Sequence, residues 1–269
     1  MKLLTKAWYQ TMLNSGLGVQ LRVDDRAAMF SETVFQEAWE KALNDRLAMR
    51  EDICYEYEEP WDADEERRYF EECHRGELEI FRTQTPAPIL EKVADMRMLA
   101  LGLCTAEVYA DFKEYRDKCR NRTEKTLEEA FSMCRSQGLE QAWTGEHSLH
   151  DSLVLSLKRE GEDLIIEFER EDPMERLDDI RENDPELLEE LGEEEFLFPE
   201  IRAIRFREAR ILKQEQSPEH AWWLYDEIWR TEAGEYEIHA LLWRDDDIFE
   251  LTIACRDTEL VWTVLPKTE

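Results

Sequence analysis

Residues 153–168 read LVLSLKREGEDLIIEF and contain two alternating runs separated by a polar turn. The apolar positions recur at every second residue: Leu153, Leu155 and Leu157 in the first run, and Leu164, Ile166 and Phe168 in the second. A period of two places such side chains on one face of an extended strand. Because an acidic turn at 160–163 joins the runs, the segment predicts an antiparallel hairpin with one apolar face.

The same period recurs towards the end of the chain. Apolar and polar residues alternate at 204–207, 236–242, 249–253 and 260–264. Short polar turns join the last three runs, which predicts a meander of three consecutive paired strands. With the hairpin, these runs indicate a sheet of about six strands.

Upstream of residue 148 the apolar pattern has the period of helices. Between Phe35 and Leu47 apolar residues recur at three- and four-residue steps, which is typical of an amphipathic helix. Asp62 with Glu65, and Thr126 with Glu129, have the spacing of capping boxes and predict two helix starts.

These patterns predict an α+β fold, with helices segregated to one side of a mainly antiparallel sheet of about six strands. We expect a helical region over 1–140 and a β-rich region over 141–269. An acidic insert at 170–199 contains two Asp-Pro pairs, which suit the starts of two short surface helices. A cation-binding loop is the alternative, although the ligand spacing of a calcium hand is missing.

The chain is strongly acidic, with a formal net charge of −31 at pH 7. A protein that neutralises phosphates needs clustered Lys and Arg, so this charge disfavours direct binding to nucleic acid or to an anionic membrane. The same field would attract a basic protein partner. Solubility alone also explains an excess of carboxylates, and salt adaptation is a third interpretation.

No export signal or long apolar run is apparent in the sequence, which leads us to expect a cytoplasmic protein. The six cysteines are scattered without CxxC pairs, and we expect them to be reduced thiols. Cys104 and Cys255 lie within apolar runs and are expected in the core.

The densest group of potential metal ligands is His147, His150 and Asp151. Two imidazoles beside a carboxylate could ligate zinc or a similar metal. On a strand, however, His147 and His150 would face opposite ways. A structural hydrogen-bonding or capping pair of His150 with Asp151 is therefore the alternative.

The most aromatic segment spans residues 222–229. Trp222, Trp223, Tyr225 and Glu227 are its candidate contacts with a ligand or partner, because Trp and Tyr are enriched where proteins bind one another. Aromatic residues are also ordinary core residues where a sheet meets helices.

One basic cluster stands out in the β-rich region, formed by Arg202, Arg205, Arg207 and Arg210. Pairing with carboxylates on neighbouring strands is the favoured role for these side chains. An anion-binding site is the alternative.

Several short motifs resemble an uncharacterised family of Gram-positive bacteria, domain of unknown function 4085. They are MKLLTK-x-WY-x-x-M at 1–12, LHD at 149–151, WLY-x-E at 223–227 and ELTI at 250–253. The resemblance spans nearly the whole chain and implies a bacterial cytosolic protein. It implies no activity, cofactor or site.

Three functions remain open. The leading hypothesis is a non-catalytic interaction protein without a cofactor, motivated by the charge, the Trp-rich β region and the lack of a catalytic motif. Its more specific form is an antitoxin- or immunity-like protein that covers a basic effector. The alternatives are a metal-dependent enzyme centred on His147, His150 and Asp151, and a protein that binds a small ligand in a cleft between the two halves.

Overall fold

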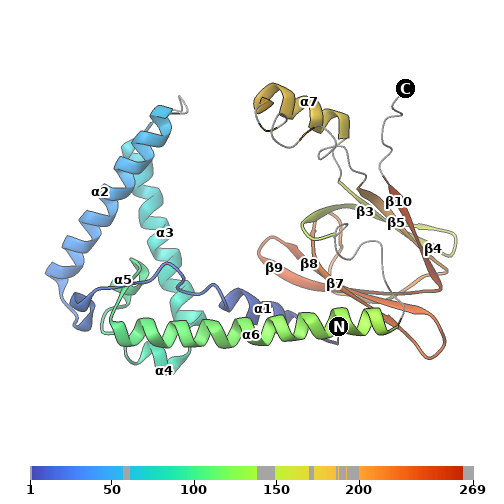
Figure 1. Cartoon of the computed structure of the whole chain (residues 1–269), viewed down its shortest axis with the longest axis horizontal. Helices are drawn as coiled ribbons and strands as arrows, with labels where there is room; N and C mark the ends of the chain where they lie inside the picture. Colours follow the sequence, from blue (N-terminus) through green and yellow to red (C-terminus); the bar gives the residue numbers. More distant parts are fainter. Residues whose placement is uncertain are drawn as a thin grey trace. The chain divides into compact units, whose positions relative to one another are not determined.

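The fold is α+β: helices dominate the first half of the chain and an antiparallel sheet the second (Figure 1). Two compact units make up the chain, residues 10–123 and residues 1–9 together with 124–269. The expected boundary at residue 140 lies outside the described residues. The computed structural model describes residues 2–56, 61–137, 149–169, 173–185, 187, 192 and 200–262.

Helices and two very short strands form the first unit, and α1 and α6 each extend into the second. The elements are α1 (Lys6–Asn14), β1 (Arg22–Val23), η1 (Asp25–Ala28), α2 (Glu32–Glu56), α3 (Ala63–Gln84), α4 (Ala87–Leu90), α5 (Met96–Ala100), β2 (Leu103–Cys104) and α6 (Ala106–Ser136). Asp62 caps α3 as predicted, because its carboxylate accepts hydrogen bonds from the backbone N–H groups of Asp64 and Glu65.

The core of the helical unit is small. Phe81 of α3 meets Phe112 of α6 edge-on, with ring centroids 5.7 Å apart, and both side chains are fully buried. Beside them the buried guanidinium of Arg116 donates to the backbone carbonyl groups of Leu17 and Gly18. These bonds supply the acceptors that a buried charge needs.

The predicted helix start at Thr126 and Glu129 is wrong, because α6 runs without a break from Ala106 to Ser136. An N-cap residue must leave helical geometry, and no Gly or Pro in this stretch interrupts the helix. A capping-box spacing in the interior of a helix is therefore not a boundary.

Strands dominate the second unit and lie in two layers in Figure 1. The elements are β3 (Ser152–Glu160), β4 (Asp163–Phe168), α7 (Pro173–Asn183), β5 (Ile201–Arg207), β6 (Arg210–Gln214), β7 (Trp222–Arg230), β8 (Tyr236–Arg244), β9 (Asp247–Cys255) and β10 (Asp257–Trp262). The hairpin predicted at 153–168 is confirmed as β3 and β4. Helix α7 occupies the first half of the acidic insert, whereas most of the second half lies outside the described residues.

The sheet has eight strands in the order β10-β5-β4-β3-β7-β8-β9-β6, not about six. The two strands that were not predicted are β6 and β7. Two long strands are also bent. One continues from β5 into β6 across Glu208 and Ala209, and the other from β9 into β10 across Arg256. Since β5 pairs with β10 and β6 with β9, the two ends of the sheet meet and the strands form a closed circuit.

The predicted three-stranded meander is wrong in its last step. Strands β8 and β9 pair as expected, but β10 pairs with β5 instead of β9. Only Arg256 separates β9 from β10, and a hairpin needs a loop of about two residues or more. The chain therefore bends at Arg256 and does not reverse.

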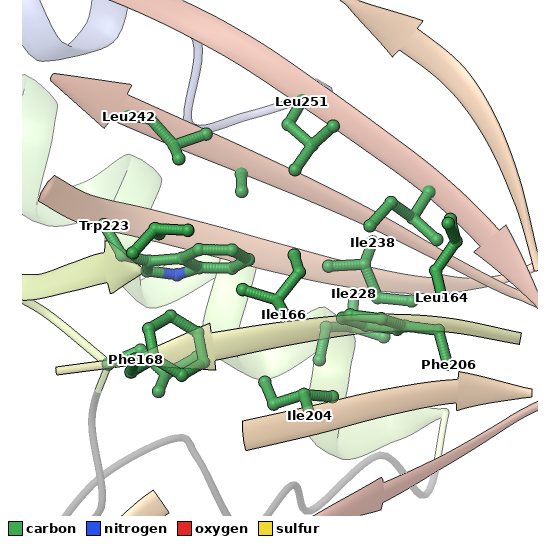
Figure 2. Packing of buried hydrophobic residues seen from close by; sticks show 14 of the residues in the cluster. Leu164, Ile166, Phe168, Ile204, Phe206, Trp223, Ile228, Ile238, Leu242 and Leu251 are labelled. Carbon is green, nitrogen blue, oxygen red and sulfur yellow. The ribbon is translucent and has the colours of Figure 1, made fainter. Parts of the chain in front are cut away.

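The interior of this circuit is filled by apolar side chains that point towards one another from both layers (Figure 2). Trp223 is the largest of them and is only 1% exposed. Its ring meets Phe168 edge-on, with centroids 5.7 Å apart, and its Nε1 donates to the Asp226 carboxylate at 2.9 Å. The core interpretation of the aromatic segment therefore holds for Trp223.

A β-bulge changes which face of β3 enters the core. The register shifts between Val154 and Ser156, so Val154 is fully buried and Leu155 is 44% exposed. Leu157 packs against the core again beyond the bulge. The expectation that Leu153, Leu155 and Leu157 share one apolar face is wrong, because the extra residue reverses the alternation.

The end of α6 covers an open edge of β7. Strand β3 pairs with β7 only at Trp222 and Trp223, which leaves the rest of that edge without a strand partner. There the thiol of Cys134 donates to the carbonyl of Ile228 at 3.4 Å, and the side-chain oxygen of Gln137 accepts the N–H of Arg230 at 2.6 Å. These contacts satisfy backbone groups of β7 that lie beyond its short pairing with β3.

Cross-strand pairing of the basic cluster is confirmed for Arg205 and Arg207, whose guanidinium groups both contact Asp163 of the neighbouring strand β4, whereas Arg210 pairs with Glu235 in the turn before β8. Arg205 and Arg207 lie 2.9 Å from Glu160 and 2.7 Å from Asp163, respectively, and Arg210 lies 2.6 Å from Glu235. All six cysteines are free thiols, and Cys104 and Cys255 are buried, as expected. Among the described helices, none is both long and apolar enough to cross a bilayer.

The neighbouring tryptophans of β7 provide a test of this packing. Trp223→Ala should lower the free energy of unfolding by about 3–5 kcal/mol, because it leaves a cavity in the core. Trp222→Ala, which truncates a side chain that is 38% exposed, should cost about 1 kcal/mol. Urea unfolding of both variants measures the difference, and equal losses would contradict the assignment of the two faces.

Candidate functional site

The candidate partner residues divide between the two faces of β7. A register shift between Trp223 and Tyr225 places Trp222, Tyr225, Glu227 and Trp229 on the face turned away from the core. Trp223 lies in the core and has no surface to offer a partner. The outer face of β7 is therefore where a contact can be made.

Residues 2–9, hereafter the N-terminal segment, are fixed to this outer face by Glu227. The Glu227 side chain is 2% exposed, and its carboxylate accepts the backbone N–H groups of Lys2 and Leu3, the latter at 3.1 Å. The ammonium group of Lys2 lies 4.3 Å from the ring centroid of Trp229. Two charge-assisted hydrogen bonds to backbone donors explain why a carboxylate is buried here.

Glu227 belongs to a row of buried polar side chains across three strands. In register, Glu227 of β7 lies opposite His239 of β8, which lies opposite Thr252 of β9. Nδ1 of His239 is 3.3 Å from the Thr252 hydroxyl, and its Nε2 lies 2.6 Å from Glu237 at an angle outside hydrogen-bonding geometry. Burial lowers the pKa of His239, although Glu227 and Glu237 oppose this effect.

This row has few of the features of a reactive centre. The Glu227 carboxylate is occupied by backbone donors, and both nitrogens of His239 face side chains of the same sheet. A general base must reach a proton on a substrate. We therefore assign the row a role in fixing the N-terminal segment.

Two separately predicted groups of residues meet at Tyr225. The ring of His150 stands edge-on to it with centroids 4.8 Å apart, and the ring of Trp8 does the same at 4.9 Å. Tyr9 completes the cluster at 6.0 Å. Burial raises the pKa of Tyr225, and the neighbouring Tyr9 and Asp151 add to the effect.

His150 and Asp151 form a pair in the turn that leads into β3. Nδ1 of His150 lies 2.9 Å from a carboxylate oxygen of Asp151, whose backbone has φ 60°. The third predicted ligand, His147, lies outside the described residues. Within the part of the chain that the structure describes, no three His, Cys, Asp or Glu side chains are grouped to hold a metal ion.

The exposed end of the outer face contains two tryptophans on adjacent strands. Trp222 of β7 lies directly opposite Trp243 of β8, and each side chain is 38% exposed. Trp243 was not among the residues predicted from the sequence. Its signal was the alternation of β8, in which Trp243 lies on the face opposite Ile238, Ala240 and Leu242.

An acidic turn adjoins this tryptophan pair, Trp222 and Trp243. Asp245 and Asp246 connect β8 to β9 with φ 50° and 64°, the left-handed conformation that a two-residue hairpin loop requires. The Asp245 side chain is 92% exposed. The guanidinium of Arg244 donates to the carbonyl groups of Ser217 and Glu219, so its donors are used within the chain.

Comparison with known proteins adds no identification, since no family model, curated protein or solved structure matches the chain. The resemblance to the domain of unknown function 4085 therefore stays a prediction.

The contact between Glu227 and the N-terminal segment can be tested directly. Glu227→Gln removes the charge and one acceptor oxygen, and should lower the free energy of unfolding by about 1–3 kcal/mol. Hydrogen exchange at the amides of Lys2 and Leu3 should also accelerate. Glu232→Gln, at an exposed position, is the matched control. Unchanged exchange in Glu227→Gln would contradict the assigned contact.

A second contact of the N-terminal segment depends on pH. The Lys6 ammonium lies 2.5 Å from Glu215 and, together with Lys213 and the backbone N–H of Glu250, lowers the pKa of this carboxyl to about 2. Because the pKa in the unfolded chain is about 4.3, the stabilisation is complete above that pH and is lost as the pH falls towards the folded value. Both side chains are partly exposed, so the contribution should stay below about 1 kcal/mol.

The measurement is the free energy of unfolding of wild type and Glu215→Gln as a function of pH. The difference between the two proteins should be constant near neutral pH and should vanish in acid. Glu219→Gln, at an exposed position nearby, should show no such pH dependence. A difference that grows as the pH falls would have the wrong sign for this ion pair.

Proposed function

We propose that the chain is a non-catalytic interaction protein that binds a basic protein partner through the tryptophan pair and the acidic turn beside it. The observation that carries the proposal is the exposure of Trp222 and Trp243, which lie opposite one another and are each 38% exposed. Tryptophan is enriched among the residues that dominate binding energy in protein interfaces. Large apolar side chains that are adjacent and exposed suit such a site.

The charge of the chain supports a basic partner. Acidic residues number 65 against 34 Lys and Arg, and the guanidinium of Arg244, next to Trp243, is engaged within the chain. Asp245, Asp246 and Asp247 therefore form an acidic margin around an aromatic centre. Charged margins of this kind steer association and select partners by sign.

The proposed surface is distinct from the covered part of the same sheet face. The N-terminal segment packs over Tyr225, Glu227 and Trp229, while the tryptophan pair remains exposed. An antitoxin- or immunity-like protein that covers a basic effector is one form of this function.

Binding to proteins in an extract of the host organism tests the proposal. Wild type, Trp222→Ser/Trp243→Ser and Asp245→Asn/Asp246→Asn are immobilised and compared at low and moderate salt. The wild type should retain a basic protein, the tryptophan variant should bind it at least about tenfold more weakly, and the aspartate variant should associate more slowly.

Two controls separate specific binding from charge attraction. Tyr55→Ser truncates another exposed aromatic residue, 88% exposed in the helical unit, and should leave binding unchanged. An oligo-arginine peptide should bind wild type and the tryptophan variant equally. Retention of no basic protein, or equal retention by the tryptophan variant, would contradict the proposal.

A further inference from the structure

Two adjoining hollows lie on the helical unit between α2, α3 and the short strand β1. One has a volume of about 370 Å³ and the other about 230 Å³, and Arg22, Ala42 and Leu101 line both of them. Ligand sites are usually concave and mostly apolar, with a few polar groups that fix orientation. The hollows combine an apolar floor with a cationic margin.

Short elements hold this margin in place. The backbone N–H of Arg22 donates to the carbonyl of Gly102 at 2.7 Å, and that of Asp24 donates to the carbonyl of Cys104 at 2.8 Å. Gly102 has φ 77°, a conformation that favours glycine. These bonds fix β1 along β2 and so position Arg22 beside the small side chain of Ala42 on α2.

Among the Arg and Lys side chains that line the two hollows, Arg26, Lys41 and Arg46 each pair with a carboxylate, whereas Arg22 has no such partner among the described residues. It makes no side-chain ion pair or hydrogen bond with any described residue. The carboxylates that line the same hollows have other donors: Arg26 lies 2.7 Å from Asp24, Lys41 lies 2.7 Å from Asp45, and Gln20 lies 3.3 Å from Glu77. The guanidinium of Arg22, at the junction of the two hollows, therefore has donors available for a ligand.

Arg46 brings a second guanidinium to the larger hollow. Its Nε donates to Glu66 at 3.1 Å, and the guanidinium lies 4.8 Å from the ring centroid of Tyr69. A planar guanidinium binds carboxylate and phosphate groups through paired N–H donors. The floor between Arg22 and Arg46 is formed by Ala42, Leu101 and Phe70, which offer apolar surface.

We infer that these hollows form a binding site for a small molecule that has one oxyanion group, carboxylate or phosphate, and an apolar body. The oxyanion pairs with Arg22, and the apolar body lies on Ala42 and Leu101. The site belongs to the helical unit and uses no residue of the tryptophan pair. Its existence is independent of the proposed function.

Calorimetric titration with four probes tests the inference. Phenyl phosphate and phenylacetate carry an apolar ring with each oxyanion, inorganic phosphate lacks the ring, and benzyl alcohol lacks the charge. At least one of the ring-bearing anions should bind saturably and more tightly than inorganic phosphate and benzyl alcohol. The comparison of phenyl phosphate with phenylacetate identifies the preferred oxyanion.

Variants then locate the site. Arg22→Gln should weaken binding about tenfold or more, because it removes a charge-assisted contact. Arg82→Gln, at an exposed position on α3 that does not line the hollows, should change binding less than about twofold. Ala42→Phe fills the hollow and should abolish binding, whereas Ala48→Phe, at an exposed position on α2, should not. Absence of saturable binding, or binding unaffected by both Arg22→Gln and Ala42→Phe, would overturn the inference.

Discussion

The buried carboxylate of Glu227 is the contact on which the organisation of the β-rich unit depends. It joins residues that are 224 and 225 positions apart in the chain and holds the N-terminal segment against β7. Because the opposite face of β7 is occupied by the core, this contact determines which part of the outer face remains exposed. The exposed part contains the tryptophan pair.

Ion pairing accounts for the distribution of charge. Arg205, Arg207 and Arg210 pair with carboxylates, and Arg244 donates to backbone carbonyl groups. What remains on the surface is an excess of carboxylates, including the turn beside the tryptophan pair. Arg22 has no carboxylate partner among the described residues, and the carboxylates that line the same hollows have other donors.

Much of the fold followed from local patterns in the sequence. The hairpin at 153–168, the cap at Asp62 and the alternation of β8 and β9 depend on neighbouring residues alone. The bulges near Leu155 and at 223–225 could not be predicted, because a single extra residue reverses which side chains face the core. Strand order could not be predicted either, because β10 pairs with β5, which lies about fifty residues earlier in the sequence.

The candidate site could be predicted only in part, because tertiary packing decides which aromatic side chains are exposed. Trp222 and Trp223 are adjacent and identical in type, yet only tertiary packing decides that one is exposed and the other buried. Trp243 was not predicted, because only the register of β7 and β8 places it opposite Trp222. The meeting of His150 with Tyr225 depends on the entry of β3 beside β7, which no local pattern encodes.

Oxidative footprinting of the tryptophans, with mass spectrometry as the readout, tests the central claim most directly. In buffer, Trp222 and Trp243 should be oxidised while Trp8 and Trp223 are protected, because the latter two are 7% and 1% exposed. In an extract of the host organism, Trp222 and Trp243 should become protected as the partner binds. Oxidation of both residues to the same extent in buffer and in extract would contradict the account.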